Sequence, residues 1–354
     1  MIETLQAYFT EPRLAVAAAM LALGVVFGAL SESSQFCLQG GVREARQGEG
    51  AGRLRAFFAG ALAALAITQG LVAAGALDLS GAMQLTAAAA APAIAIGGFL
   101  FGVGAALTRG CAGRLTILAA TGNLRALVVI IVVGLFGYMA MRGLLAPARL
   151  ALEGFARPAG PTPDLVTLAG WGASGRFALA GVAGAGALWL AARAGGWRGL
   201  GALLIGAVVA ATWAASAWLG DDGFDKLAPW APSFIAPLGN GLVFLLTYTG
   251  ARVDAGAAFI AGVLVGAFGS AQVGGRARLV SFETPRQTVR YLAGGALMGF
   301  GGVMALGCST GQGLSGVSTL APASFLALAS IIAGVWAGVA MDARTGQGLG
   351  QAKA

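Results

Sequence analysis

Two of the three cysteines in this chain occupy matching places in two similar segments. Cys111 follows Gly110 and Cys308 follows Gly307, and each Gly-Cys pair ends an apolar, glycine-rich run. A thiol can serve as a nucleophile, a metal ligand or a weak hydrogen-bond donor to a soft atom. The sequence contains no histidine, the usual partner of a nucleophilic or zinc-binding cysteine. The residue types favour non-covalent contact with a soft solute, and we expect no catalytic residue, metal site or cofactor.

The two Gly-Cys pairs belong to an internal repeat. Residues 97–111 align with 294–308 without a gap, and seven of these fifteen positions are identical. A weaker similarity relates 24–29 to 262–267 through a shared Gly-xxx-Gly pattern. Paired, interrupted hydrophobic segments in the two halves of a chain indicate the central site of a transporter.

We expect each helix to break at its Gly-Cys pair, which leaves the cysteine at membrane depth. The residues that follow can begin a new half-helix, and free amides at a helix amino terminus bind anions without a charged side chain. The plain alternative is that Gly-Cys is a small packing pair, because free cysteine is often buried. The residues expected to shape these half-helix termini are Gly110, Ala112, Gly113, Gly307, Ser309, Thr310 and Gly311.

Cys37 lies in the polar and glycine-rich stretch 31–41, directly after the first apolar run. An ordinary loop is the alternative interpretation of this stretch. The residue at the corresponding place by the weaker repeat is Gly275, so the third thiol has no counterpart in the second half. Three thiols at three depths would form a file of sites rather than one pocket.

Arginines flank only one of the two Gly-Cys pairs. Arg109 and Arg114 lie on either side of Cys111, where they either attract an anion or extend to a lipid headgroup. A second basic segment, 276–290, is interpreted either as an external funnel for anions or as an ordinary cytoplasmic anchor.

The composition places these motifs in a membrane. Of the 354 residues, 58% are hydrophobic and only 10% are charged, and the mean hydropathy is +0.82. A water-soluble domain is far less apolar. The net charge of +8 comes from arginines in short patches between apolar runs, which is typical of topology signals and does not indicate nucleic-acid binding.

The apolar runs predict an all-α integral membrane protein with about ten helical spans. We expect two pseudo-symmetric, inverted halves whose broken or re-entrant helices meet at the centre. A single membrane domain, 1–354, would hold a first repeat at about 14–145, connecting helices at about 146–250 and a second repeat at about 255–341. The predicted spans are 14–30, 54–75, 92–108, 124–145, 176–194, 198–219, 233–251, 255–271, 291–307 and 322–341.

Basic residues in short loops predict the orientation. The loop after the first span carries Arg43, Arg46, Arg53 and Arg55, which makes it cytoplasmic and the amino terminus periplasmic. Counting spans onward from the acidic loop at 221–225 then puts the basic segment 276–290 outside. Either a re-entrant segment shifts the count, or these arginines face outward.

The motif Gly307-Cys308-Ser309-Thr310-Gly311-Gln312-Gly313, with Gly110-Cys111-Ala112-Gly113 and Phe36-Cys37, resembles the YeeE/YedE family of bacterial sulfur-transport membrane proteins. The resemblance covers nearly the whole chain. It implies thiosulfate uptake across the bacterial inner membrane past three important cysteines, which correspond to Cys37, Cys111 and Cys308. A small soluble sulfur carrier of the TusA type often accompanies the family on the cytoplasmic side.

The leading hypothesis is therefore thiosulfate transport in which three protonated thiols act as weak S–H donors. Weak, repeated sites suit conduction, since the solute must leave each site as readily as it enters. A membrane sulfurtransferase that forms a cysteine persulfide is the alternative from another class. A transporter for a selenium compound and a generic anion channel in which the thiols only pack also stay open.

Overall fold

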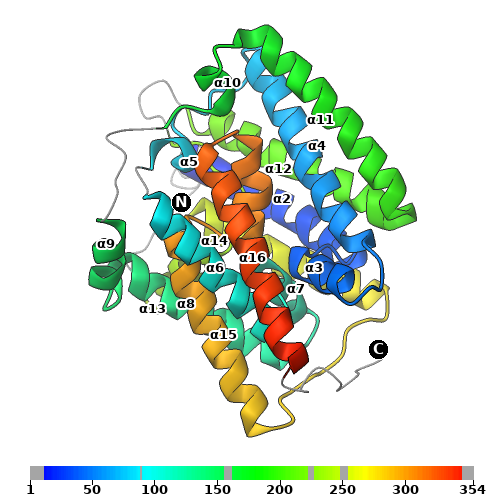
Figure 1. Ribbon diagram of the computed structural model, residues 1–354, viewed down its shortest axis with the longest axis vertical. Coiled ribbons are helices and arrows are strands. Elements are labelled where there is room, and N and C mark those ends of the chain that lie inside the picture. Colours follow the sequence, from blue (N-terminus) through cyan, green and yellow to red (C-terminus); the bar gives the residue numbers. More distant parts are fainter. Residues whose placement is uncertain (1–11, 88–89, 155–161, 222–226, 248–253, 345–354) are drawn as a thin grey trace, which may run out of the picture.

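The computed structural model describes residues 12–87, 90–154, 162–221, 227–247 and 254–344 (Figure 1). Within these ranges the regular structure is helical, apart from one bridge between Asn123 and Val280. The ten longer helices are α2 (Pro12–Ser33), α4 (Gly52–Ala73), α6 (Ala91–Leu107), α8 (Leu124–Arg142), α11 (Gly172–Ala194), α12 (Gly196–Leu219), α13 (Ile235–Leu246), α14 (Ala255–Val273), α15 (Pro285–Met304) and α16 (Pro322–Arg344). The shorter ones are α3 (Leu38–Arg46), α5 (Met83–Thr86), α7 (Ala112–Ala120), α9 (Ala146–Glu153), α10 (Leu165–Leu168) and a π-helical turn, η2 (Gly311–Gly316).

Each of the ten predicted spans coincides with a helix, and the all-α membrane fold is confirmed. Eight helical segments in the described part of the chain are long and apolar enough to cross a membrane. The run at 233–251 becomes the 12-residue helix α13, which is short for a full crossing. Helix α15 has 20 residues, but its first two turns carry Arg286 and Arg290. The number of ten spans and the pseudo-symmetry of the halves stay predictions.

The glycines of the repeat bring helix backbones into direct contact. A Cβ atom on Gly28 would overlap the carbonyl oxygen of Val263, and one on Gly266 would overlap that of Val25, so α2 and α14 touch along their Gly-xxx-Gly faces. Between α6 and α15, Gly97 lies against Gly301 in the same way. Small residues are needed where transmembrane helices approach this closely.

We expect Gly266→Ala to lower the thermal stability and the folded yield of the protein, because the new methyl group has no room beside Val25. Overpacking of this kind costs about 1–3 kcal/mol. Gly269 lies one turn further on the same helix and has no atom within 4 Å of the position of an added Cβ. Gly269→Ala is therefore the matched control and should melt like the wild type in a detergent-based thermal assay. Equal melting of the two variants would contradict the close packing of α2 and α14.

The basic segments gather at one end of the helical bundle. Arg46, at the end of α3, donates to the backbone oxygen of Trp336 at 3.1 Å and lies over its ring. Arg290 of α15 pairs with Asp342 of α16 at 2.6 Å. Arg276, just after α14, pairs with Glu32 near the end of α2 at 2.7 Å. The segment 276–290 thus lies at the same end as the loop after α2, and the count of simple crossings fails because the chain contains half-helices.

Candidate functional site

Three turns of the same form interrupt the bundle, and each one leads to a cysteine. A residue with a positive φ angle stands two positions before the thiol in every case: Gln35 at 56°, Arg109 at 59° and Leu306 at 57°. In each turn the next amide donates to a carbonyl five residues earlier, which closes the preceding helix by a Schellman motif. These amide-to-carbonyl pairs are Phe36 to Ser31 at 3.2 Å, Gly110 to Ala105 at 3.0 Å and Gly307 to Gly302 at 2.8 Å.

Left-handed backbone is unfavourable for residues other than glycine, by about 1–2 kcal/mol each. Among the described residues, the non-glycine positions with positive φ are these three and Leu320. Strain of this kind persists where the surrounding structure enforces it, and it gathers at functional sites. A left-handed residue thus occurs two positions before every thiol, and the three turns share one backbone conformation.

A short helix begins directly after each cysteine. Cys37 caps α3, and its Sγ accepts the amide of Gly40 at 3.3 Å. Cys111 occupies the capping position of α7. Cys308 precedes the helix at 309–318, and its Sγ accepts the amide of Gly311 at 3.3 Å. The predicted breaks at the Gly-Cys pairs are therefore present, and a third break of the same kind occurs at Cys37.

The three helix starts face one small internal cavity of about 10 Å³. Cys37 and Cys111 line it directly, and the third helix contributes Ser309 and Thr310. All three cysteines are buried and free. The thiols of Cys37 and Cys111 lie close enough to each other to interact directly. The structure thus brings these two together instead of setting them at separate depths.

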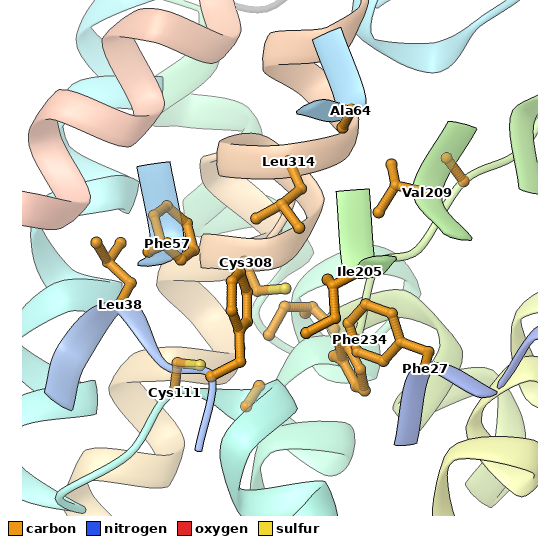
Figure 2. Close-up of a cluster of buried hydrophobic side chains, with 14 of the residues drawn as sticks. Phe27, Leu38, Phe57, Ala64, Cys111, Ile205, Val209, Phe234, Cys308 and Leu314 are labelled. Atoms are coloured by element: carbon orange, nitrogen blue, oxygen red, sulfur yellow. The ribbon is translucent and has the colours of Figure 1, made fainter. Parts of the chain in front are cut away.

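Apolar side chains enclose the thiols. Figure 2 shows the sulfur atoms of Cys111 and Cys308 among Phe57, Phe234 and Leu314. Phe27, Phe36 and Phe57 also line the cavity. A cavity needs about 10–15 Å³ to hold one water molecule, so this one is closed in the observed state. A solute can pass only if the surrounding side chains move.

The glycines of the second and third turns bring the helix starts together. A Cβ atom on Gly113 would lie 3.0 Å from the ring of Phe234 and 3.3 Å from Oγ1 of Thr310. One on Gly311 would lie 2.9 Å from Oγ of Ser233. Ala112 is fully buried, and Gly307 has a φ angle of 155°. The predicted supporting residues thus lie where α7 meets the helix at 309–318.

Arg114 places a positive charge at this cavity. Its Nη2 donates to Oε1 of Gln35 at 2.5 Å, and its Nη1 is buried without a hydrogen-bond partner among the described residues. Gln35 in turn donates from Nε2 to the backbone oxygen of Glu32 at 2.9 Å. The guanidinium is therefore held by the strained turn before Cys37, and one of its donors remains for a bound anion.

Arg109 lies elsewhere. It lines a larger cavity of about 640 Å³ on the other face of α7, together with Arg125, Arg286 and Arg290. The two arginines flanking Cys111 are thus divided between two cavities. Sequence reasoning missed Gln35, for which the only signal was its position in the polar stretch at 31–41.

Positive potential is the common property of the small cavity. Each of the three short helices directs its amino terminus, and so the positive end of its dipole, toward the thiols. The guanidinium of Arg114 adds a full positive charge in apolar surroundings, where a charge acts more strongly than in water. The arrangement suits a small anion with a soft atom that can approach the thiols.

Comparisons with known proteins agree with this chemistry. A family model described as sulphur transport matches residues 33–337. The thiosulfate transporter TsuA of Escherichia coli (strain K12) is 33% identical over 101 residues, which is 28% of this chain and 28% of that protein. The thiosulfate transporter TsuA of Spirochaeta thermophila is 42% identical over 80 residues, 22% of this chain and 23% of that protein. The aligned region thus spans about a quarter of the length of these relatives.

Proposed function

Because the chain belongs to the sulphur transport family, whose model spans residues 33–337, we propose that it carries thiosulfate, or a closely related sulfur-containing anion, across a membrane. The observation that supports this most directly is the convergence of three cysteine-capped helix starts on one cavity. Both relatives are thiosulfate transporters by name.

The thiols make the site suitable for sulfur. Thiosulfate carries two negative charges and one soft terminal sulfur atom. The helix termini and Arg114 attract the charge, while protonated Cys37, Cys111 and Cys308 offer weak S–H donors to the soft atom. Weak donors bind the ion without a deep energy well, which conduction requires.

The basic end of the bundle faces the cytoplasm in this proposal, in line with the positive-inside rule. The start of α2 then lies on the periplasmic side of the bacterial inner membrane. Thiosulfate delivered to the basic end is available to a soluble carrier of the TusA type, which would be the partner on that side.

Uptake of radiolabelled thiosulfate into vesicles that contain only this protein tests the proposal. We expect accumulation that unlabelled thiosulfate suppresses and that sulfate or selenite suppresses weakly, because neither presents a soft sulfur to the thiols. Vesicles without the protein are the control. No uptake above that control would contradict the proposal. So would a stable gain of one sulfur atom in the intact mass of the protein, which would indicate a persulfide enzyme.

A further inference from the structure

A cavity much larger than the one beside the thiols lies outside the site described above. Its volume is about 640 Å³, and it opens at the basic end of the bundle. Arg109, Arg125, Arg286 and Arg290 line it, from the turn before Cys111 and the starts of α8 and α15. The thiols themselves do not line this space.

The lining carries more positive than negative charge. Arg125 has Glu283 at 3.8 Å, but the Glu283 side chain is 78% exposed. Arg290 pairs with Asp342 and donates to the backbone oxygen of Leu107 at 3.0 Å. Its Nη2 atom is nevertheless buried without a hydrogen-bond partner within the described ranges. Even with Arg109 left out of the count, three guanidinium groups stand beside two carboxylates among the described residues, and this excess of positive charge favours an anion.

Helix α7 separates this cavity from the thiols. Leu115 and Leu118 face the large cavity, whereas Gly113, Arg114 and Ile117 face the small one. Arg109 belongs to the turn that ends at Cys111, so the backbone of that turn borders both spaces. An anion that leaves the thiols on this side meets the basic cavity next.

The two cavities differ in how much water they can hold. A cavity needs only about 10–15 Å³ to hold one water molecule, so a volume of 640 Å³ leaves room for an anion together with many waters. An anion can keep its hydration shell there, whereas the 10 Å³ space beside Cys37 and Cys111 would strip it. Cysteine is also absent from the lining of the large cavity.

We propose that the cavity lined by Arg109, Arg125, Arg286 and Arg290 is a second anion site, which binds hydrated divalent oxyanions at the basic end of the transport route. This inference rests on the proposed function. The site selects for charge and is indifferent to soft sulfur, so it binds sulfate as well as thiosulfate. It collects the ion after the thiol cavity and keeps it near the basic face of the protein.

Binding of radiolabelled sulfate to the purified full-length protein tests the second site. We expect saturable binding that persists in Cys111→Ala, because no thiol contributes to it. The double variant Arg125→Gln/Arg286→Gln should weaken sulfate binding about tenfold or more, the factor for losing a charge-assisted contact. The control Arg193→Gln removes an arginine at the end of α11, which lies over Trp189 away from both cavities, and should bind sulfate like the wild type.

A single substitution at an exposed residue tests the site independently, in case the double variant does not fold. Glu283→Gln removes the carboxylate beside Arg125 and should tighten sulfate binding severalfold. Absence of saturable sulfate binding to the wild type, or equal affinity in wild type, double variant and Glu283→Gln, would overturn the second site. Thiosulfate uptake, measured on the same wild-type preparation, distinguishes failure of the second site from failure of the proposed transport. If the protein takes up thiosulfate but does not bind sulfate, only the second site is contradicted.

Discussion

Replacing Cys111 or Cys308 by alanine is expected to abolish thiosulfate uptake while the protein still reaches the membrane. Each thiol stands at the start of a half-helix in an apolar enclosure, where it would offer its S–H group to the soft sulfur of the ion. Uptake should fall to the level of vesicles without protein. The measurement is the initial rate of labelled thiosulfate uptake, with membrane content and thermal stability determined on the same samples.

Serine provides the sharper comparison. A hydroxyl group keeps the helix-capping interaction that Cys308 makes with the amide of Gly311, and it fills nearly the same space. Serine variants should therefore fold normally and still fail to transport thiosulfate. Unchanged flux in a variant with serine at all three positions would show that the thiols only pack, as in a generic anion channel.

Removal of the charge of Arg114 should have the second-largest effect. A hydrogen bond to a charged group contributes about 1.5–3 kcal/mol, so Arg114→Gln should raise the half-saturating thiosulfate concentration roughly 10- to 150-fold. The buried Nη1, which has no hydrogen-bond partner in the part of the chain that the structure describes, is the donor that this variant removes. Concentration-dependent uptake measures the effect. Arg43→Gln, on α3, removes a surface contact to Gln47 and is the control.

The role of Gln35 can be separated from that of the charge. Gln35→Met keeps the guanidinium of Arg114 but removes the oxygen that holds it. The half-saturating concentration should then rise less than in Arg114→Gln. Wild-type affinity in both variants would contradict the assignment of Arg114 to the anion.

The sequence predicts the helices and the breaks well because both are local properties. Apolar runs mark every long helix, and glycine followed by cysteine marks two of the three breaks. The break at Cys37 has Phe36 where the other two breaks have Gly110 and Gly307, so composition identifies it only as a polar stretch. Its left-handed residue is apparent only in the folded backbone.

Contacts between distant segments could not be predicted in this way. Gln35 and Arg114 are 79 positions apart, and their hydrogen bond depends on how α7 turns back toward α2. The proximity of Cys37 to Cys111 also depends on how α7 turns back toward α2. Counting membrane crossings cannot predict at which end of the bundle the segment 276–290 lies, because half-helices do not cross the membrane. The ion pair between Arg276 and Glu32 shows that this segment lies at the end where α2 finishes.

The closed cavity between the three helix starts has a consequence for the energy supply of the cell. A continuous chain of hydrogen-bonded water molecules through a membrane protein would let protons flow down their gradient and dissipate the membrane potential. A space of about 10 Å³ between aromatic rings and thiols cannot hold such a chain. If the transport route runs past the thiols as proposed, the resting protein would therefore not leak protons along it.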